Sequence, residues 1–86
     1  MRASHILVRT EKEAKDILAE ASPANFASLA QQHSLCPSKS QGGDLGEFGP
    51  GMMVKPFEDG VRVTEIGAIS PPVMTQFGWH LIYRTA

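Results

Sequence analysis

The chain has 86 residues, of which 42% are hydrophobic and 20% are charged, and its formal net charge is −1. This length fits one domain, residues 1–86, with a small core, and the composition excludes a disordered chain. The balanced charge gives no reason to expect nucleic acid or an anionic membrane as a partner.

Cys36 is the only cysteine, so no disulfide can form within the chain. A single thiol favours a reducing compartment. No apolar run approaches the ~20 residues that span a bilayer, and the first ordered pattern begins at Ala3, so we expect no signal peptide. Together these features predict a cytoplasmic protein.

Residues 3–9 are apolar and partly β-branched, a pattern typical of a buried strand. Thr10 begins a Thr-x-x-Glu capping box, and apolar residues at helical spacing follow, so we expect a first helix over 11–21. Asn25 can cap a second helix, whose apolar face begins at Phe26.

Residues 34–51 differ in composition, because this stretch is rich in Ser and Pro and holds five glycines. A long loop in so small a domain usually carries function. Within it, residues 44–48 alternate enough to predict a short strand. Pro56 suits the first turn of a third helix over 55–62, and Gly60 inside that helix predicts that it is short or frayed.

Residues 73–75 and 79–84 are predicted strands, with Gly78 between them. The elements therefore follow in the order strand, helices, strand, helix and two strands. Helices that interrupt a small sheet in this way predict an α+β domain with a four-stranded, mostly antiparallel sheet.

Two histidines lie on predicted strands, His5 on the first and His80 on the last. First and last strands often lie side by side in small sheets, so we expect the two side chains to be neighbours. Each lies among large apolar residues, and a buried ring nitrogen without a partner costs ~1–3 kcal/mol. The other histidine, Thr75 and Cys36 are candidate partners, and one interpretation is a structural polar cluster that fixes the strand register.

The same residues allow two other chemistries. Cys36 and a histidine are the minimum for a nucleophilic dyad, although no Asp or Asn stands out that would orient the histidine. His33 and Cys36 have an H-x-x-C spacing that is compatible with zinc, together with His5 and His80, although zinc sites usually show two paired spacings.

Several apolar residues are candidates either for the core or for a ligand pocket: Leu45, Met53, Phe57 and Phe77. Core packing explains any one of them. Met53 and Phe57 are four residues apart, at helical spacing, but Met52 next to Met53 is an unusual place for a core. Flexible thioethers beside aromatic rings form an adaptable apolar pocket of a kind that accepts a proline ring.

Four motifs follow one another along the chain: S-H-I-L-V at 4–8, G-G-D-L-G-x-F at 42–48, G-x-M-x-x-P-F-E-D at 51–59 and F-G-[YW]-H-[IL]-I at 77–82. With these motifs the chain resembles the parvulin-type peptidyl-prolyl cis/trans isomerases over essentially its whole length. The stretch from Ser34 to Phe48 is especially similar to the small single-domain bacterial parvulins.

The resemblance implies an FKBP-like fold, in which about four helices wrap a four-stranded antiparallel sheet. It implies that His5 and His80 lie face to face and that Cys36 and Thr75 complete a hydrogen-bonded tetrad beneath the substrate. It also implies a proline pocket and a neighbouring apolar residue, formed by Leu45, Met53, Val54, Phe57 and Phe77. The implied reaction is rotation about X-Pro bonds, with no cofactor and no metal.

The expected partners are proline-containing peptides and unfolded protein clients, and we expect a monomer. The alternative is a chaperone module of the same fold that holds proline segments with little turnover. Some parvulins require a phosphorylated residue before proline and bind it with clustered cations. Here Val8 leads almost directly into the first helix, Arg9 and Lys12 are accompanied by two acids, and no pair of arginines is present. We therefore expect uncharged residues to be preferred directly before proline.

Overall fold

The computed structural model describes residues 1–86. Its strands form one antiparallel sheet of four strands in the order β2-β1-β4-β3. They are β1 (Arg2–Val8), β2 (Asp44–Glu47), β3 (Val73–Thr75) and β4 (Gly78–Arg84). The predicted α+β fold with a four-stranded antiparallel sheet is therefore confirmed.

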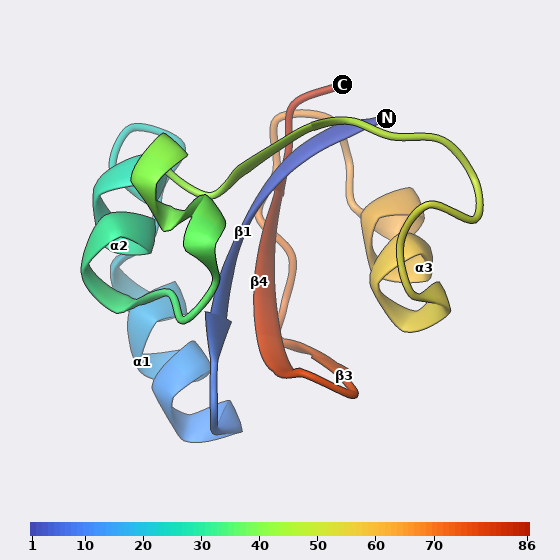
Figure 1. Cartoon of the computed structure of the whole chain (residues 1–86). Helices are drawn as coiled ribbons and strands as arrows, with labels where there is room; N and C mark the ends of the chain where they lie inside the picture. Colours follow the sequence, from blue (N-terminus) through green and yellow to red (C-terminus); the bar gives the residue numbers. More distant parts are fainter.

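Three α-helices cover the two faces of this sheet. They are α1 (Glu11–Glu20), α2 (Phe26–His33) and α3 (Lys55–Val63), and a short 3₁₀ helix, η1 (Pro37–Gln41), follows α2. Figure 1 shows α1 and α2 on one side of the strands and α3 on the other. None of the helices is both long enough and apolar enough to cross a membrane.

Side chains alternate between the two faces of β1 and β4, so each face has its own core. Ile6 and Leu81 pack against α1 and α2. Ala3 and Ile82 pack on the opposite face with Phe57 of α3. By the same alternation, the two histidines on these strands project toward α3.

Gly60 does not interrupt α3, which is short, as expected, and ends one residue beyond the predicted range of 55–62. The helix has nine residues and continues through Gly60 to Val63. A Cβ atom on Gly60 would lie 3.1 Å from Ile82 Cδ1 and 3.1 Å from a methyl group of Val73. The missing side chain therefore lets the helix approach the sheet closely, and this packing outweighs the low helix propensity of glycine.

Gly43 makes a similarly close approach to the strand that carries His5. The His5 amide donates to the Gly43 carbonyl at 2.9 Å, and Gly43 has a φ of 83°. A Cβ atom at this position would overlap the carbonyl oxygen of His5, which is backbone and has no room to move. Gly43 thus fixes where the chain entering β2 meets the middle of β1.

Gly43→Ala should lower the free energy of unfolding much more than Gly46→Ala, as measured by urea denaturation. Both glycines have positive φ, but a Cβ on Gly46 meets open space. Gly46→Ala should therefore cost about 1–2 kcal/mol, the penalty for the left-handed conformation alone. Equal losses in the two variants would show that the approach to His5 does not constrain the fold.

Candidate active site

His5 and His80 form a hydrogen-bonded pair in the middle of the sheet. Their Nδ1 atoms lie 2.9 Å apart, and the two ring planes are nearly parallel, with an interplanar angle of 18°. Both residues are buried. They meet because β1 and β4 are antiparallel neighbours in which His5 lies opposite Ile82, so His80 is its diagonal neighbour on the same face.

Thr75 adds a third residue to this hydrogen-bonded group. Its Oγ1 lies 2.7 Å from His80 Nε2, and the same oxygen accepts a hydrogen bond from the Phe77 amide at 3.1 Å. Thr75 is the last residue of β3 and Phe77 lies in the turn that leads into β4. The turn and the histidine pair are thus joined by one hydroxyl group.

Cys36 lies beside the histidines but makes no hydrogen bond to them through its thiol, so the chain of bonds has three members rather than the expected four. The reason is how its segment is anchored. The Ser34 hydroxyl accepts hydrogen bonds from the amides of Leu7 and Cys36, and the Leu35 amide donates to the Leu7 carbonyl at 2.8 Å. These bonds tie the segment to the end of β1 and leave His5 Nε2 without a partner.

Burial keeps both histidines neutral at physiological pH. It lowers the pKa of His5 to about 4, with a smaller contribution from His80, and it lowers the pKa of His80 to about 4. A neutral imidazole carries one N–H, so one Nδ1 donates to the other. The direction of this bond also decides whether His80 donates to Thr75 or accepts from it.

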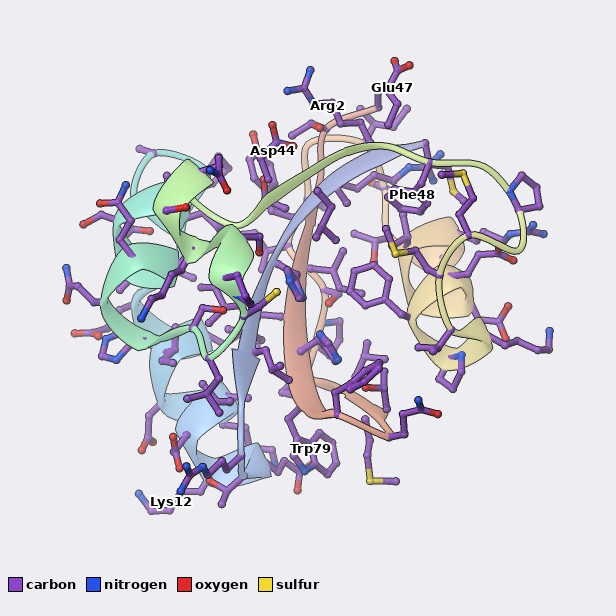
Figure 2. All side chains as sticks on the ribbon, in the orientation of Figure 1. Arg2, Lys12, Asp44, Glu47, Phe48 and Trp79 are labelled. Atoms are coloured by element: carbon purple, nitrogen blue, oxygen red, sulfur yellow. The ribbon has the colours of Figure 1, made fainter.

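A cavity of about 360 Å³ opens over the histidine pair. It is lined almost entirely by apolar side chains, and none of its lining residues is Asp, Glu, Lys or Arg. The lining residues are His5, Leu7, Leu35, Cys36, Pro37, Leu45, Met53, Val54, Phe57, Phe77 and His80. Figure 2 shows the labelled charged side chains, Arg2, Lys12, Asp44 and Glu47, at the periphery of the molecule.

The structure brings the predicted site residues together around this cavity. Eight of the nine line it, and Thr75 lies behind His80, to which it is bonded. The cavity also has three lining residues that were not expected: Leu7, Leu35 and Pro37. Leu7 follows His5 by two residues and therefore shares its strand face, which is a signal that the sequence contained.

The ring of Phe57, which belongs to α3, packs against both histidine rings. Its ring is nearly perpendicular to both, with centroids 5.5 Å from His5 and 5.1 Å from His80. It is 3% exposed, and edge-to-face contacts of this kind fix ring orientation as well as bury area. The floor of the cavity is therefore a packed aromatic group rather than a mobile surface.

The residues of the zinc alternative do not gather at one point. His33 is exposed at the end of α2, while His5 and His80 are buried in the sheet. No group of three or more His, Cys, Asp or Glu side chains is arranged to hold a metal ion. The geometry gives this interpretation no support.

Residues 5–86 match the family model described as Rotamase: PPIC-type PPIase domain. The chain belongs to this family of peptidyl-prolyl isomerases. It is 52% identical over 87 residues to foldase protein PrsA 4 of Bacillus cereus, covering 99% of this chain and 31% of that protein. It is 46% identical over 93 residues to a putative peptidyl-prolyl cis-trans isomerase, Cbf2, of Campylobacter jejuni, covering 98% of this chain and 34% of that protein. The chain thus spans about a third of the length of these curated relatives.

Solved structures of this rotamase family share the fold over the whole chain. The peptidylprolyl isomerase PrsA of Bacillus anthracis superposes with a TM-score of 0.93 at 44% identity, covering 100% of this chain and 41% of that one. NmPin, the parvulin of Nitrosopumilus maritimus, superposes with a TM-score of 0.87 at 40% identity, covering 100% of this chain and 95% of that one. The predicted parvulin family is therefore confirmed.

Stability of this rotamase domain should fall as the pH drops from about 6.5 toward about 4, because both histidines have folded pKa values of about 4, below their ordinary value of 6.5. In that window the unfolded chain binds more protons than the folded chain, so acid favours unfolding. The free energy of unfolding should fall by about 2 kcal/mol or more between neutral pH and pH ~5. Urea denaturation across this range measures it.

His80→Asn removes one titrating group and keeps an amide that can hydrogen-bond. Its stability should therefore depend less steeply on pH than that of the unmodified chain over the same range. Identical slopes in the two proteins would contradict the burial of a neutral His80.

Proposed function

We propose that this chain catalyses rotation about X-Pro peptide bonds by holding the proline ring in the cavity over the histidine pair, without a covalent step. The observation that carries this proposal is the combination of a cavity of about 360 Å³ with an uncharged, apolar lining. A pocket of this size and polarity suits a small apolar ring with one or two polar groups nearby.

The energy that such a reaction needs is modest. Isomerisation crosses a barrier of ~20 kcal/mol, and a thousandfold acceleration requires about 4 kcal/mol of preferential binding to the twisted transition state. The twisted amide loses resonance and is less polar than the planar one, so apolar surroundings favour it. Met53 and Phe57 pack on the ring, while Phe77, which is 61% exposed, leaves apolar surface at the mouth for neighbouring residues.

Cys36 supports the non-covalent form of this proposal. A nucleophilic thiol needs a base within hydrogen-bond reach or a charged neighbour that stabilises the thiolate. The Cys36 thiol makes no hydrogen bond, both nearby histidines are neutral, and no carboxylate lines the cavity. Cys36 therefore contributes a half-buried, apolar side chain to the wall of the cavity.

The same cavity argues against a requirement for phosphate before proline. A phosphate carries about −2 charge and needs several converging Arg or Lys donors. No such residue lines the cavity, and only Arg9 and Thr10 separate β1 from α1, so no long basic loop is present. Uncharged residues such as Leu or Ala suit the position before proline better than glutamate or phosphoserine.

Proline-containing peptides and unfolded proteins are the proposed clients. Relatives carry the names foldase protein and peptidyl-prolyl isomerase, and one solved neighbour from Campylobacter jejuni is described as a SurA-like chaperone. The exposed apolar side chains Leu35 and Phe77 at the cavity support contact with such segments beyond proline. A module that only holds these segments stays the alternative, and the cytoplasmic location and the monomeric state stay predictions from sequence.

Exchange NMR on peptides Ala-X-Pro-Phe tests this function. Catalytic amounts of protein should accelerate interconversion for X = Leu well above the blank, and X = Glu or phosphoserine should turn over more slowly because their charge must leave water. Intact mass should show no adduct during turnover. Binding of the leucine peptide without acceleration would support the holding module instead, and faster turnover of the phosphoserine peptide would reveal a cation cluster that the cavity does not show.

A further inference from the structure

Glu58 is a buried carboxylate that the proposed reaction does not use. It lies on α3 directly after Phe57, and it is 9% exposed. Its Oε1 accepts a hydrogen bond from the Gly51 backbone amide at 2.7 Å, and its Oε2 lies 3.1 Å from a guanidinium nitrogen of Arg62. Burial of a carboxylate is costly unless both oxygens are satisfied, and here both have donors.

The loop of residues 49–53, between β2 and α3, has few other anchors. Within the loop, the Met52 amide donates to the Gly49 carbonyl at 3.3 Å, and the Gly49 amide contacts Met52 Sδ at 3.1 Å. The bond from Gly51 to Glu58 is the one hydrogen bond that joins this loop to another element. It also holds Gly51, whose φ is 84°.

The end of this loop forms part of the proline cavity. Met53, the last loop residue, lines the cavity and packs against the same core cluster as Phe57. The next residue, Val54, also lines the cavity, but it caps α3 and its carbonyl accepts from the Glu58 amide at 3.0 Å. Phe57 belongs to the helix, whereas Met53 belongs to the loop. The distance between these two side chains therefore depends on a contact that joins the loop to the helix. Glu58 provides it, because it follows Phe57 in the helix and bonds to a residue two before Met53 in the loop.

We propose that Glu58 is a positioning residue of the isomerase, which holds Met53 in the cavity wall beside Phe57 through its bond to the Gly51 amide. This proposal rests on the proposed function of the cavity. The Glu58–Arg62 pair contributes little by itself, because the Arg62 side chain is 51% exposed and pairs at the surface are weak. Loss of the Glu58 side chain should therefore release the loop from α3 and lower the affinity of the cavity for the proline ring.

Substitutions at Glu58 distinguish the role of its oxygen as a hydrogen-bond acceptor from the role of its negative charge. Glu58→Ala removes the acceptor for Gly51, whereas Glu58→Gln keeps an oxygen at the same reach and loses only the ion pair. Asp59→Ala is the matched control, because Asp59 lies on the same helix and forms an exposed pair with Lys55.

In exchange NMR on Ala-Leu-Pro-Phe, Glu58→Ala should raise KM about three- to tenfold with kcat within about twofold, since the wall binds ground state and transition state alike.

Glu58→Gln and Asp59→Ala should keep KM within about twofold of the unmodified chain, because both retain an acceptor for the Gly51 amide. Amide hydrogen exchange at Gly51 provides a readout that does not depend on activity. It should be faster in Glu58→Ala than in either of the other two variants.

The outcomes separate this proposal from the proposed function. If the unmodified chain lacks turnover, the proposed function fails, while Gly51 exchange and the peptide dissociation constant still test the role of Glu58. An unchanged Gly51 exchange rate in Glu58→Ala, or an unchanged affinity for peptide in that variant, overturns the positioning role. Glu58→Gln behaving like Glu58→Ala also overturns it, because the charge rather than the acceptor would then matter.

Discussion

The hydrogen bond between His5 and His80 joins the two central strands on the face that carries the cavity. Its 2.9 Å length requires that at least one Nδ1 carries no proton, because two imidazolium groups at this distance would repel each other without a counter-ion. Burial supplies this condition by lowering both pKa values to about 4. The β1–β4 register brings the two rings together, and the uncharged floor of the cavity depends on this pair.

The walls around the pair come from segments far apart in the chain, and each wall is held by a specific local bond. The Ser34 hydroxyl ties the Cys36 segment to the end of β1, and the Thr75 hydroxyl holds the turn before β4. Glu58 joins the loop after β2 to α3, and the Gly43 carbonyl accepts from His5. The cavity is therefore assembled by backbone amides and carbonyls as much as by its own apolar lining, so changes outside the lining can alter binding.

Much of this architecture is predictable from periodicity. Alternation along residues 79–84 separates His80 and Ile82 from Leu81, and the structure places them on opposite faces of the sheet. Helices α1 and α3 begin and end within one residue of the expected positions, because Thr10 caps the first and Pro56 lies in the first turn of the second. Asn25 precedes α2 as expected but makes no side-chain capping bond.

The details that the sequence did not reveal depend on contacts between distant segments. The position of the Cys36 thiol follows from a hydrogen bond between Ser34 and Leu7, which no local pattern encodes. Gly60 looks like a weak point in a helix until Val73 and Ile82 are found against it. Glu58 has the spacing of a solvent-exposed pair with Arg62, and only the fold shows that it is buried and bound to Gly51.

Nitrogen-15 NMR of the histidine rings tests the neutral, hydrogen-bonded pair most directly. At pH ~5, midway between the folded and ordinary pKa values, both rings should still show the shifts of neutral imidazoles, with one protonated and one bare Nδ1. A scalar coupling between the two Nδ1 atoms would identify the bond itself. If either His5 or His80 titrates near its ordinary value of 6.5, the pair is not the buried, neutral centre of this site.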